Sequence, residues 1–242
     1  MTEIMTLKDN TIWHLAHSSF SLKLDGKLFI FDYYMPESDR QGQGLAQGFI
    51  DPEEIADEET YVLNSHSHPD HYNRVVFDWE KAVDDITYIM SSDIRGVPLE
   101  AISLDPFQEV DLDGVRVKSY PATDAGVAYS VFVGDKHVYH AGDNAFWNWQ
   151  GTMPDEAYVE VLFVIDRSQP VDIAFTLCDP RLEGLGEGGT LIFAKTMKPR
   201  LLVPMHSFGD YKINEKMKVV LEEHAPDVGF WPIKGPGESY SL

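Results

Sequence analysis

Short runs of apolar and β-branched residues, separated by two-residue turns, recur along the first half of the chain. Asp25-Gly26, Asp113-Gly114 and Gly134-Asp135 each stand between two such runs. A two-residue turn that contains glycine, flanked by β-rich segments, is the strongest short-range signal of a β-hairpin. The pattern therefore predicts hairpins whose strands cover residues 20–24 and 27–32, 109–112 and 115–120, and 127–133 and 137–140.

The spacing of apolar residues becomes helical in several other segments. Residues 211–224 carry an apolar residue at every third or fourth position, and a second helix is predicted near 190–197. Residues 51–54, Asp-Pro-Glu-Glu, have the capping Asp, the proline and the acidic first turn that are typical of a helix start. Strands are predicted at 172–177 and 201–204. This alternation indicates an α/β protein with helices packed on mixed sheets.

No internal repeat, low-complexity tract or flexible linker divides the sequence, so a single domain is expected over residues 1–242. The chain has 19 Lys and Arg against 40 Asp and Glu, a formal charge of −21. Binding to nucleic acid or to an anionic membrane surface needs basic groups, so neither partner is expected. The charge suits a protein that stays dispersed or holds cations, and it is compatible with a specific homo-oligomer.

Cys178 is the only cysteine, so an intrachain disulfide and an all-thiolate zinc site are both excluded. The first ten residues lack the basic start and apolar stretch of a signal peptide. No apolar run approaches the ~20 residues that a membrane-spanning helix needs. A cytoplasmic protein is therefore expected.

The densest polar cluster is Ser-His-Ser-His-Pro-Asp-His at residues 65–71, directly after a predicted strand at 60–64. On an extended chain His66 and His68 project to the same side, because side chains alternate with a period of two. Two imidazoles on one side form half of a typical metal site.

Pro69 ends the strand, so Asp70 and His71 approach the same cleft from another direction. Imidazole nitrogen and carboxylate oxygen both suit zinc, iron or manganese. The alternative is a surface loop that happens to be rich in histidine. With the composition of this chain, such a motif arises by chance in roughly one sequence in a thousand, so a metal site is favoured.

The cluster resembles the His-x-His-x-Asp-His motif of metallo-β-lactamase-fold hydrolases. Residues 11–32 are similar to the opening of that family, and residues 140–143, His-Ala-Gly-Asp, resemble its strand-end Gly-Asp. His206, after an apolar strand, resembles the last metal-binding histidine. The spacing is most similar to the branch of ascorbate-6-phosphate lactonase-like proteins. The resemblance implies a four-layer αββα sandwich, two mixed β-sheets flanked by helices, with the site along the sheet edges.

The chain departs from this family between the cluster and Asp143, where a further ligand histidine is usual. The matching stretch, residues 120–126, contains no histidine, and Asp124 is its only strong ligand. We assign Asp124 to this place, although an ordinary turn Asp before Gly126 is as well supported. A carboxylate in place of an imidazole shifts the preference towards manganese or iron, or leaves a single ion.

The resemblance implies one or two divalent ions, with zinc expected first and manganese or iron next. The expected metal ligands are His66, His68, Asp70, His71, Asp124, Asp143 and His206. Asp70 is also expected to accept a proton, and His140 to orient a ligand or a transition-state oxygen, so both are candidate catalytic residues.

The predicted function is hydrolysis by a metal-activated water, on an ester, a lactone or a phosphorylated small molecule. A phosphodiesterase on the same fold is one alternative. A non-hydrolytic metal-binding or regulatory protein with a degraded site is another, since the usual histidine is missing.

Several residues near the expected site receive supporting roles. Asp32 is predicted to accept the second N–H of a ligand histidine. Asp179 and Arg181 are predicted to form an ion pair, or Arg181 to hold an anionic substrate group. The glycine-rich residues 184–189 are predicted to form a loop. His17 resembles an early histidine of the family that lies near the cleft, although a buried, hydrogen-bonded structural role is expected for it.

Overall fold

Each predicted hairpin is present in the computed structural model, which describes residues 7–35, 44–147, 155–182 and 184–242. Asp25 and Gly26 both have positive φ, 53° and 77°, as a type I′ hairpin turn requires. The antiparallel pairs are β2 (Ser19–Leu24) with β3 (Lys27–Phe31), β7 (Glu109–Leu112) with β8 (Val115–Pro121), and β9 (Val127–Val133) with β10 (Lys136–His140).

The described residues form two compact units, each built around one mixed β-sheet. The first unit comprises Met1–Met90, Ile94–Ser103 and Gly235–Leu242, and the second comprises Ser91–Asp93 and Leu104–Lys234. Two mixed sheets with flanking helices confirm the predicted α/β class. That residues 1–242 act as a single domain stays a prediction.

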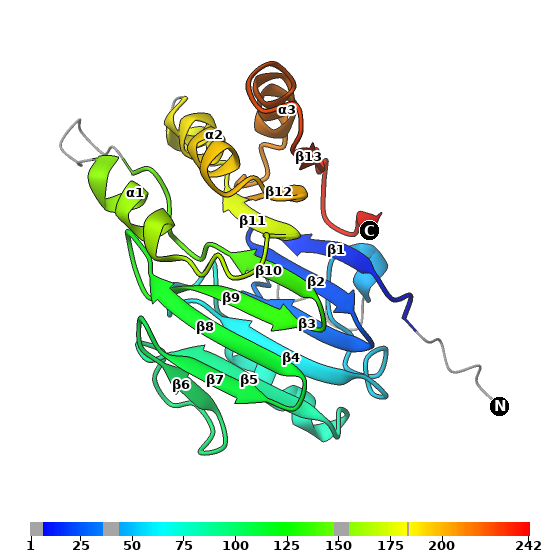
Figure 1. The fold of residues 1–242 in the computed structure, drawn as a ribbon. Coiled ribbons are helices and arrows are strands. Elements are labelled where there is room, and N and C mark those ends of the chain that lie inside the picture. The colour runs from blue at the N-terminus through cyan, green and yellow to red at the C-terminus, as the bar shows by residue number, and fades with distance from the viewer. Residues whose placement is uncertain (1–6, 36–43, 148–154, 183) are drawn as a thin grey trace. The chain divides into compact units, whose positions relative to one another are not determined.

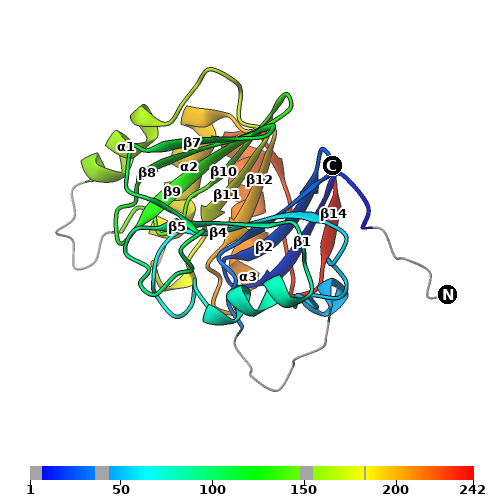
Figure 2. The same ribbon diagram turned by 90° about the horizontal axis from the view of Figure 1, so that it is seen from below.

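The sheet of the first unit has the strand order β14-β1-β2-β3-β4-β5-β6. Figure 2 shows β14, β1, β2, β4 and β5 in this order. The further bounds are β1 (Thr11–Ala16), β4 (Glu59–Asn64), β5 (Ile86–Ser91), β6 (Ile102–Leu104) and β14 (Ser239–Ser241). Strands β3, β4 and β5 are parallel, so the chain leaves β3 and β4 at the same edge of the sheet.

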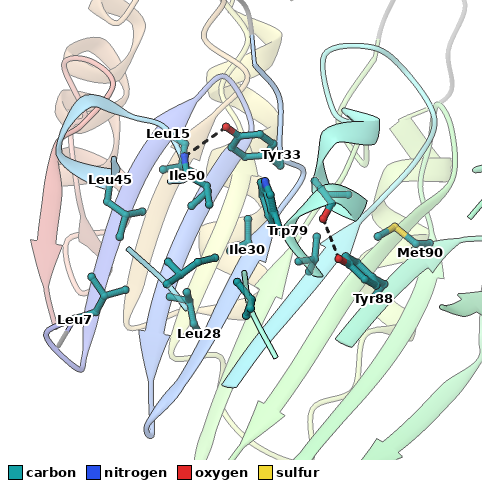
Figure 3. Packing of buried hydrophobic residues seen from close by; sticks show 14 of the residues in the cluster. Leu7, Leu15, Leu28, Ile30, Tyr33, Leu45, Ile50, Trp79, Tyr88 and Met90 are labelled. Carbon is teal, nitrogen blue, oxygen red and sulfur yellow. Dashed lines mark hydrogen bonds between the residues drawn. The ribbon is translucent and has the colours of Figure 1, made fainter. Parts of the chain in front are cut away.

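One face of this sheet carries an apolar core (Figure 3). Leu28 and Ile30 of β3 pack there with Tyr88 and Met90 of β5, as the alternation of side chains along a strand requires. The 3-10 helix η2 (Arg74–Lys81) supplies further core residues, and the Tyr88 hydroxyl donates to its Val76 carbonyl at 2.9 Å. Each large apolar side chain buried in this way contributes about 1.5–3 kcal/mol.

The sheet of the second unit has the order β13-β12-β11-β10-β9-β8-β7. Its remaining strands are β11 (Ile173–Leu177), β12 (Leu201–Met205) and β13 (Gly229–Phe230). Strands β10, β11, β12 and β13 are parallel. The segments that follow β10, β11 and β12 therefore begin at one edge of this sheet.

Three helices of the second unit are described: α1 (Asp155–Val164), α2 (Leu185–Met197) and α3 (Lys212–His224). Helix α2 packs on β11 and contacts both α1 and α3 (Figure 1). The helices predicted near 190–197 and 211–224 are confirmed as parts of α2 and α3. Within the described ranges, no helix has the length and apolar character to cross a membrane.

The helix predicted to start at Asp51 is absent, and residues 52–57 form consecutive turns. The Asp51 side chain accepts the N–H of Glu53 at 3.1 Å, and Glu54 accepts the N–H of Leu45 at 2.8 Å. The prediction was wrong because the segment has a capping signal but no apolar stripe, and packing of such a stripe supplies most of a short helix's stability.

The glycine-rich segment is also not the predicted loop, since Gly186, Gly188 and Gly189 lie in the first turns of α2. A Cβ atom on Gly186 would lie 2.7 Å from the Asp179 carbonyl oxygen, and one on Gly189 would lie 2.9 Å from the Cβ of Phe146. These glycines therefore allow α2 to approach the backbone of Asp179 and the side chain of Phe146 closely. A high frequency of glycine is typical both of such close packing and of a loop, so the sequence alone could not distinguish the two.

Candidate metal centre

The histidine cluster lies in the loop after β4, where the chain leaves the first sheet. Strand β4 ends at Asn64, as predicted, so His66 and His68 lie just beyond the end of the strand. Their rings face each other: His66 Nε2 lies 3.0 Å from His68 Nδ1. The Asn64 side chain donates to the His71 carbonyl at 2.7 Å and holds the loop compact. His66 and His71 are buried, and His68 is exposed.

Asp32, which follows β3, sets the orientation of two of these histidines. Its buried carboxylate lies 2.8 Å from His71 Nδ1 and accepts the backbone N–H and the hydroxyl of Ser65, each at 2.6 Å. Since a carboxylate only accepts, His71 Nδ1 donates and its Nε2 keeps the lone pair that a metal needs. The predicted contact of Asp32 with a histidine of the cluster is confirmed, and the role of His71 as a metal ligand stays a prediction.

The same carboxylate acts on His66 through Ser65. The Ser65 hydroxyl gives its proton to Asp32, so at 2.9 Å it accepts from His66 Nδ1, and the lone pair of His66 again lies on Nε2. One ligand atom of each of Asp32, His66 and His71 lies within 4.8 Å of the others.

Asp70 lies beside His17 in the first unit. His17 Nε2 is 3.5 Å from an Asp70 carboxylate oxygen, and the His17 ring meets His71 edge-on, 5.4 Å between centroids. The neighbouring His17 side chain lowers the pKa of Asp70 despite its partial burial. Asp70 is thus held as the carboxylate that a metal ligand must be.

The role of His17 was underestimated from the sequence. It is buried, as expected, but it contacts two expected ligands. Its φ of 51° places His17 in the left-handed region, in the turn between β1 and β2. No pattern in the sequence indicated this backbone conformation.

His206 is the centre of a hydrogen-bonded chain in the second unit. It follows β12, and its Nδ1 lies 3.0 Å from the buried Asp179 carboxylate. Its Nε2 lies 3.4 Å from Asp143 Oδ1. Because Asp179 can only accept, the proton is on Nδ1 and the Nε2 lone pair faces Asp143. When the His206 ring is neutral, its Nε2 and the facing Asp143 Oδ1 are both hydrogen-bond acceptors. Two acceptors that face each other suit a cation bound by both.

Arg181 holds Asp179 from the other side. Its Nε lies 3.0 Å from both carboxylate oxygens and its Nη2 lies 2.6 Å from one, so the predicted ion pair is confirmed. Burial alone would raise the pKa of Asp179, but hydrogen bonds from His206 and Arg181 lower it to about 2. The contact of Asp179 with His206 was not predicted. The topology offered a signal, because both residues follow adjacent parallel strands.

Asp143 lies in the loop after β10 and is buried. The Gly142 N–H donates to His140 Nδ1 at 3.2 Å, and Trp147 Nε1 donates to the Asp143 carbonyl at 3.1 Å. His140 thereby supports the loop that carries Asp143. Its expected catalytic role stays a prediction.

Asp124 is exposed in the turn between β8 and β9. Its N–H donates to the Asp143 carbonyl at 3.3 Å, and the neighbouring Thr123 hydroxyl donates to the Ala145 carbonyl at 2.7 Å. The turn is therefore fixed to the loop that carries Asp143. Whether Asp124 binds metal stays a prediction.

Two other histidines have structural roles. His14 Nδ1 lies 3.1 Å from the Gly235 carbonyl, and burial lowers the pKa of His14 to about 4. His137 Nε2 lies 2.8 Å from the Ser130 hydroxyl, and burial lowers its pKa as well. His14 thus contacts the loop before β14, and His137 of β10 contacts Ser130 of the paired strand β9.

The candidate ligand atoms of each unit are of the kinds that bind a divalent metal ion. They are imidazole nitrogens and carboxylate oxygens, which suit zinc, manganese and iron. In each unit a buried carboxylate fixes a histidine proton on Nδ1 and leaves Nε2 as the ligand atom. Cys178 is buried, and burial raises the pKa of its thiol, so it does not offer a thiolate.

Comparison with known proteins gives one related sequence and several similar structures. No protein-family profile matches the chain. A UPF0173 metal-dependent hydrolase of Nanoarchaeum equitans is 23% identical, over 81% of this chain and 82% of the relative. Igni18, a metallo hydrolase from Ignicoccus hospitalis, has a TM-score of 0.67 at 18% identity, covering 95% of this chain and 97% of its own. The metallo-β-lactamase fold protein YhfI of Bacillus subtilis has a TM-score of 0.59 at 13% identity, covering 95% and 98%.

Proposed function

We propose that this chain, which has the fold of the metallo-β-lactamase fold protein YhfI, is a metal-dependent hydrolase of a small-molecule ester, lactone or phosphorylated compound. One observation carries the proposal: buried Asp32 and buried Asp179 each fix a histidine so that its Nε2 lone pair is presented as a ligand. A histidine with a purely structural role has no need of this arrangement, whereas metal-binding histidines use it regularly.

The proposed ligands are His66, His68, Asp70, His71, Asp124, Asp143 and His206. One or two divalent ions, zinc or else manganese or iron, would lower the pKa of a water molecule and stabilise the charge that develops on the substrate. Asp70 would accept a proton during the reaction, and His140 would orient a neighbouring group. The metal-dependent hydrolase of Nanoarchaeum equitans and the metallo hydrolase Igni18 support this class of activity.

Two measurements on the full chain test the proposal. Protein purified without chelator should contain one to two equivalents of a divalent transition metal by elemental analysis. It should hydrolyse at least one member of a panel of esters, lactones, phosphomonoesters and phosphodiesters. His68→Ala should abolish that activity, while His224→Ala, an exposed histidine at the end of α3, should leave it unchanged.

The outcomes separate the possible functions. Protein that contains no metal and takes none up contradicts the proposal. Cleavage confined to phosphodiesters would identify a phosphodiesterase. Bound metal with no turnover on the whole panel would favour a binding or regulatory protein, an alternative that rests on the exposed Asp124 standing where a histidine is usual.

A further inference from the structure

Asp179 is completely buried and yet carries hydrogen bonds on both of its carboxylate oxygens. Oδ1 accepts the Arg181 backbone N–H at 2.8 Å, and the Arg181 guanidinium donates to both oxygens. The same carboxylate accepts from His206 Nδ1 at 3.0 Å. A buried charge with this many donors is fixed in both position and ionisation state.

Arg181 is itself held on its outer side. Its guanidinium lies 3.8 Å above the centroid of the Phe208 ring, and the Phe208 ring meets the His206 ring edge-on at 4.9 Å. Arg181 and His206 thus both contact Asp179, and Phe208 contacts both Arg181 and His206. The Arg181 side chain is 46% exposed, so its substitution is less disruptive than that of a buried residue.

We propose that Asp179 and Arg181 are positioning residues that keep the proton of His206 on Nδ1 and so set the metal affinity of its Nε2. This inference rests on the proposed metal-dependent function. The alternative is that the ion pair only stabilises the loop after β11, in which case the metal affinity would not depend on it.

The geometry favours the positioning role for a specific reason. Arg181 could have bonded one oxygen and left the other to water, as exposed ion pairs commonly do. Here its two nitrogens fix the plane of the carboxylate, and one oxygen of that plane receives His206 Nδ1. Replacing the Arg181 side chain would remove the donors that fix the plane of the carboxylate, and removing the Asp179 charge would weaken the acceptor for His206.

The test measures zinc affinity of the metal-free full chain by competition with a chromophoric chelator. The variants are Asp179→Asn, Arg181→Gln and Arg181→Lys. The matched control is Arg200→Gln, which removes a second Arg–Asp pair of the same unit, the exposed pair with Asp172 at 3.3 Å. Long-range ¹H–¹⁵N NMR of the metal-free chain reports the ring tautomer of His206, with His206→Gln to assign its signals.

We expect Asp179→Asn to weaken zinc binding by about 10–100-fold, the usual effect of removing such a partner, and to mix the His206 tautomers. Arg181→Gln should shift both readouts in the same direction, Arg181→Lys should restore part of the affinity, and Arg200→Gln should change neither. Folded Asp179→Asn with wild-type affinity and tautomer would overturn the inference. If Asp179→Asn does not fold, Arg181→Gln decides by the same criterion. A wild-type chain that binds no zinc would overturn the proposed function as well.

Discussion

Two buried carboxylates, Asp32 and Asp179, determine which nitrogen of the neighbouring histidine carries the proton. Asp32 acts on His71 directly and on His66 through the Ser65 hydroxyl, and Asp179 acts on His206. A histidine without such a partner exchanges between two tautomers and presents its lone pair only part of the time. At the scale of residues, the candidate ligands are therefore prepared by side chains that do not need to touch the metal.

His14 leads to a prediction about pH. It is fully buried and neutral, with a pKa of about 4 in the folded chain against 6.5 in the unfolded chain. Between these values the unfolded chain binds the proton and the folded chain does not, so the free energy of unfolding falls as the pH falls from 6.5 to 4. We expect the titration of His14 to lower the free energy of unfolding by about 3 kcal/mol over this pH interval.

Urea unfolding of the metal-free chain at pH values from 4 to 7.5 measures this effect. Glutamine cannot titrate, so in His14→Gln the free energy of unfolding should fall by about 3 kcal/mol less between pH 6.5 and 4 than in the wild type, whatever the absolute stability of the variant. The exposed His224→Gln is the control and should keep the wild-type slope. Equal slopes in wild type and His14→Gln would show that His14 is not the titrating group.

At the scale of elements, parallel strands bring the candidate ligands to the sheet edges. Strands β3 and β4 leave the first sheet at one edge, so Asp32 meets the cluster that follows Asn64. Strands β10, β11 and β12 do the same for Asp143, Asp179 and His206 in the second sheet. Ligands tend to bind beyond the carboxyl ends of parallel strands for this reason.

The glycines of α2 give a prediction with an internal control. A Cβ on Gly186 would lie 2.7 Å from the Asp179 carbonyl oxygen, whereas a Cβ on Gly188 would meet nothing within 4 Å. Gly186→Ala should therefore lower the free energy of unfolding and shift the chain at Asp179. Gly188→Ala should raise it by about 0.5–1 kcal/mol, because alanine loses less backbone entropy in a helix.

Urea unfolding of both variants checks the two signs. Zinc affinity provides a second measurement: Gly186→Ala should weaken it through Asp179, and Gly188→Ala should not. A stabilising Gly186→Ala would mean that α2 can move away from Asp179 without cost.

At the scale of the whole molecule, the formal charge of −21 bears on the choice of partners more than on the position of a metal site. That polyanionic partners are disfavoured stays a prediction, and the charge does not locate the candidate metal centre, because only a few of the acids are expected ligands. Bound divalent ions would offset up to about four units of the charge.

Metal removal should therefore lower the stability of the whole molecule. A ligand that binds only the folded chain stabilises it by about 2.7 kcal/mol when its free concentration is 100 times its dissociation constant. We expect excess chelator to lower the unfolding midpoint of freshly purified protein, and zinc added back to restore it. Calorimetry with and without chelator measures this difference, and identical curves would contradict it.

The chemistry of the cluster and the hairpins could be predicted from the sequence because both depend on local order. A two-residue glycine turn needs only its flanking residues, and His-x-His-x-Asp-His is a contiguous motif. The contact of Asp32 with a ligand histidine was also predicted, since it follows from the end of a strand. The helix at Asp51 and the glycine loop were predicted wrongly, because capping signals and glycine frequency do not report packing.

Only the tertiary structure decided the relations between residues far apart in the chain. Asp179 and His206 are separated by 26 intervening residues and meet because β11 and β12 are parallel neighbours. His17 meets Asp70 through a backbone conformation, φ of 51°, that no sequence pattern indicates. The sequence by itself determined which side chains of ligand type are present and how they are spaced along the chain. The pairing of strands determined which carboxylate orients which histidine, because a hydrogen bond depends on distance in space and not on separation along the chain.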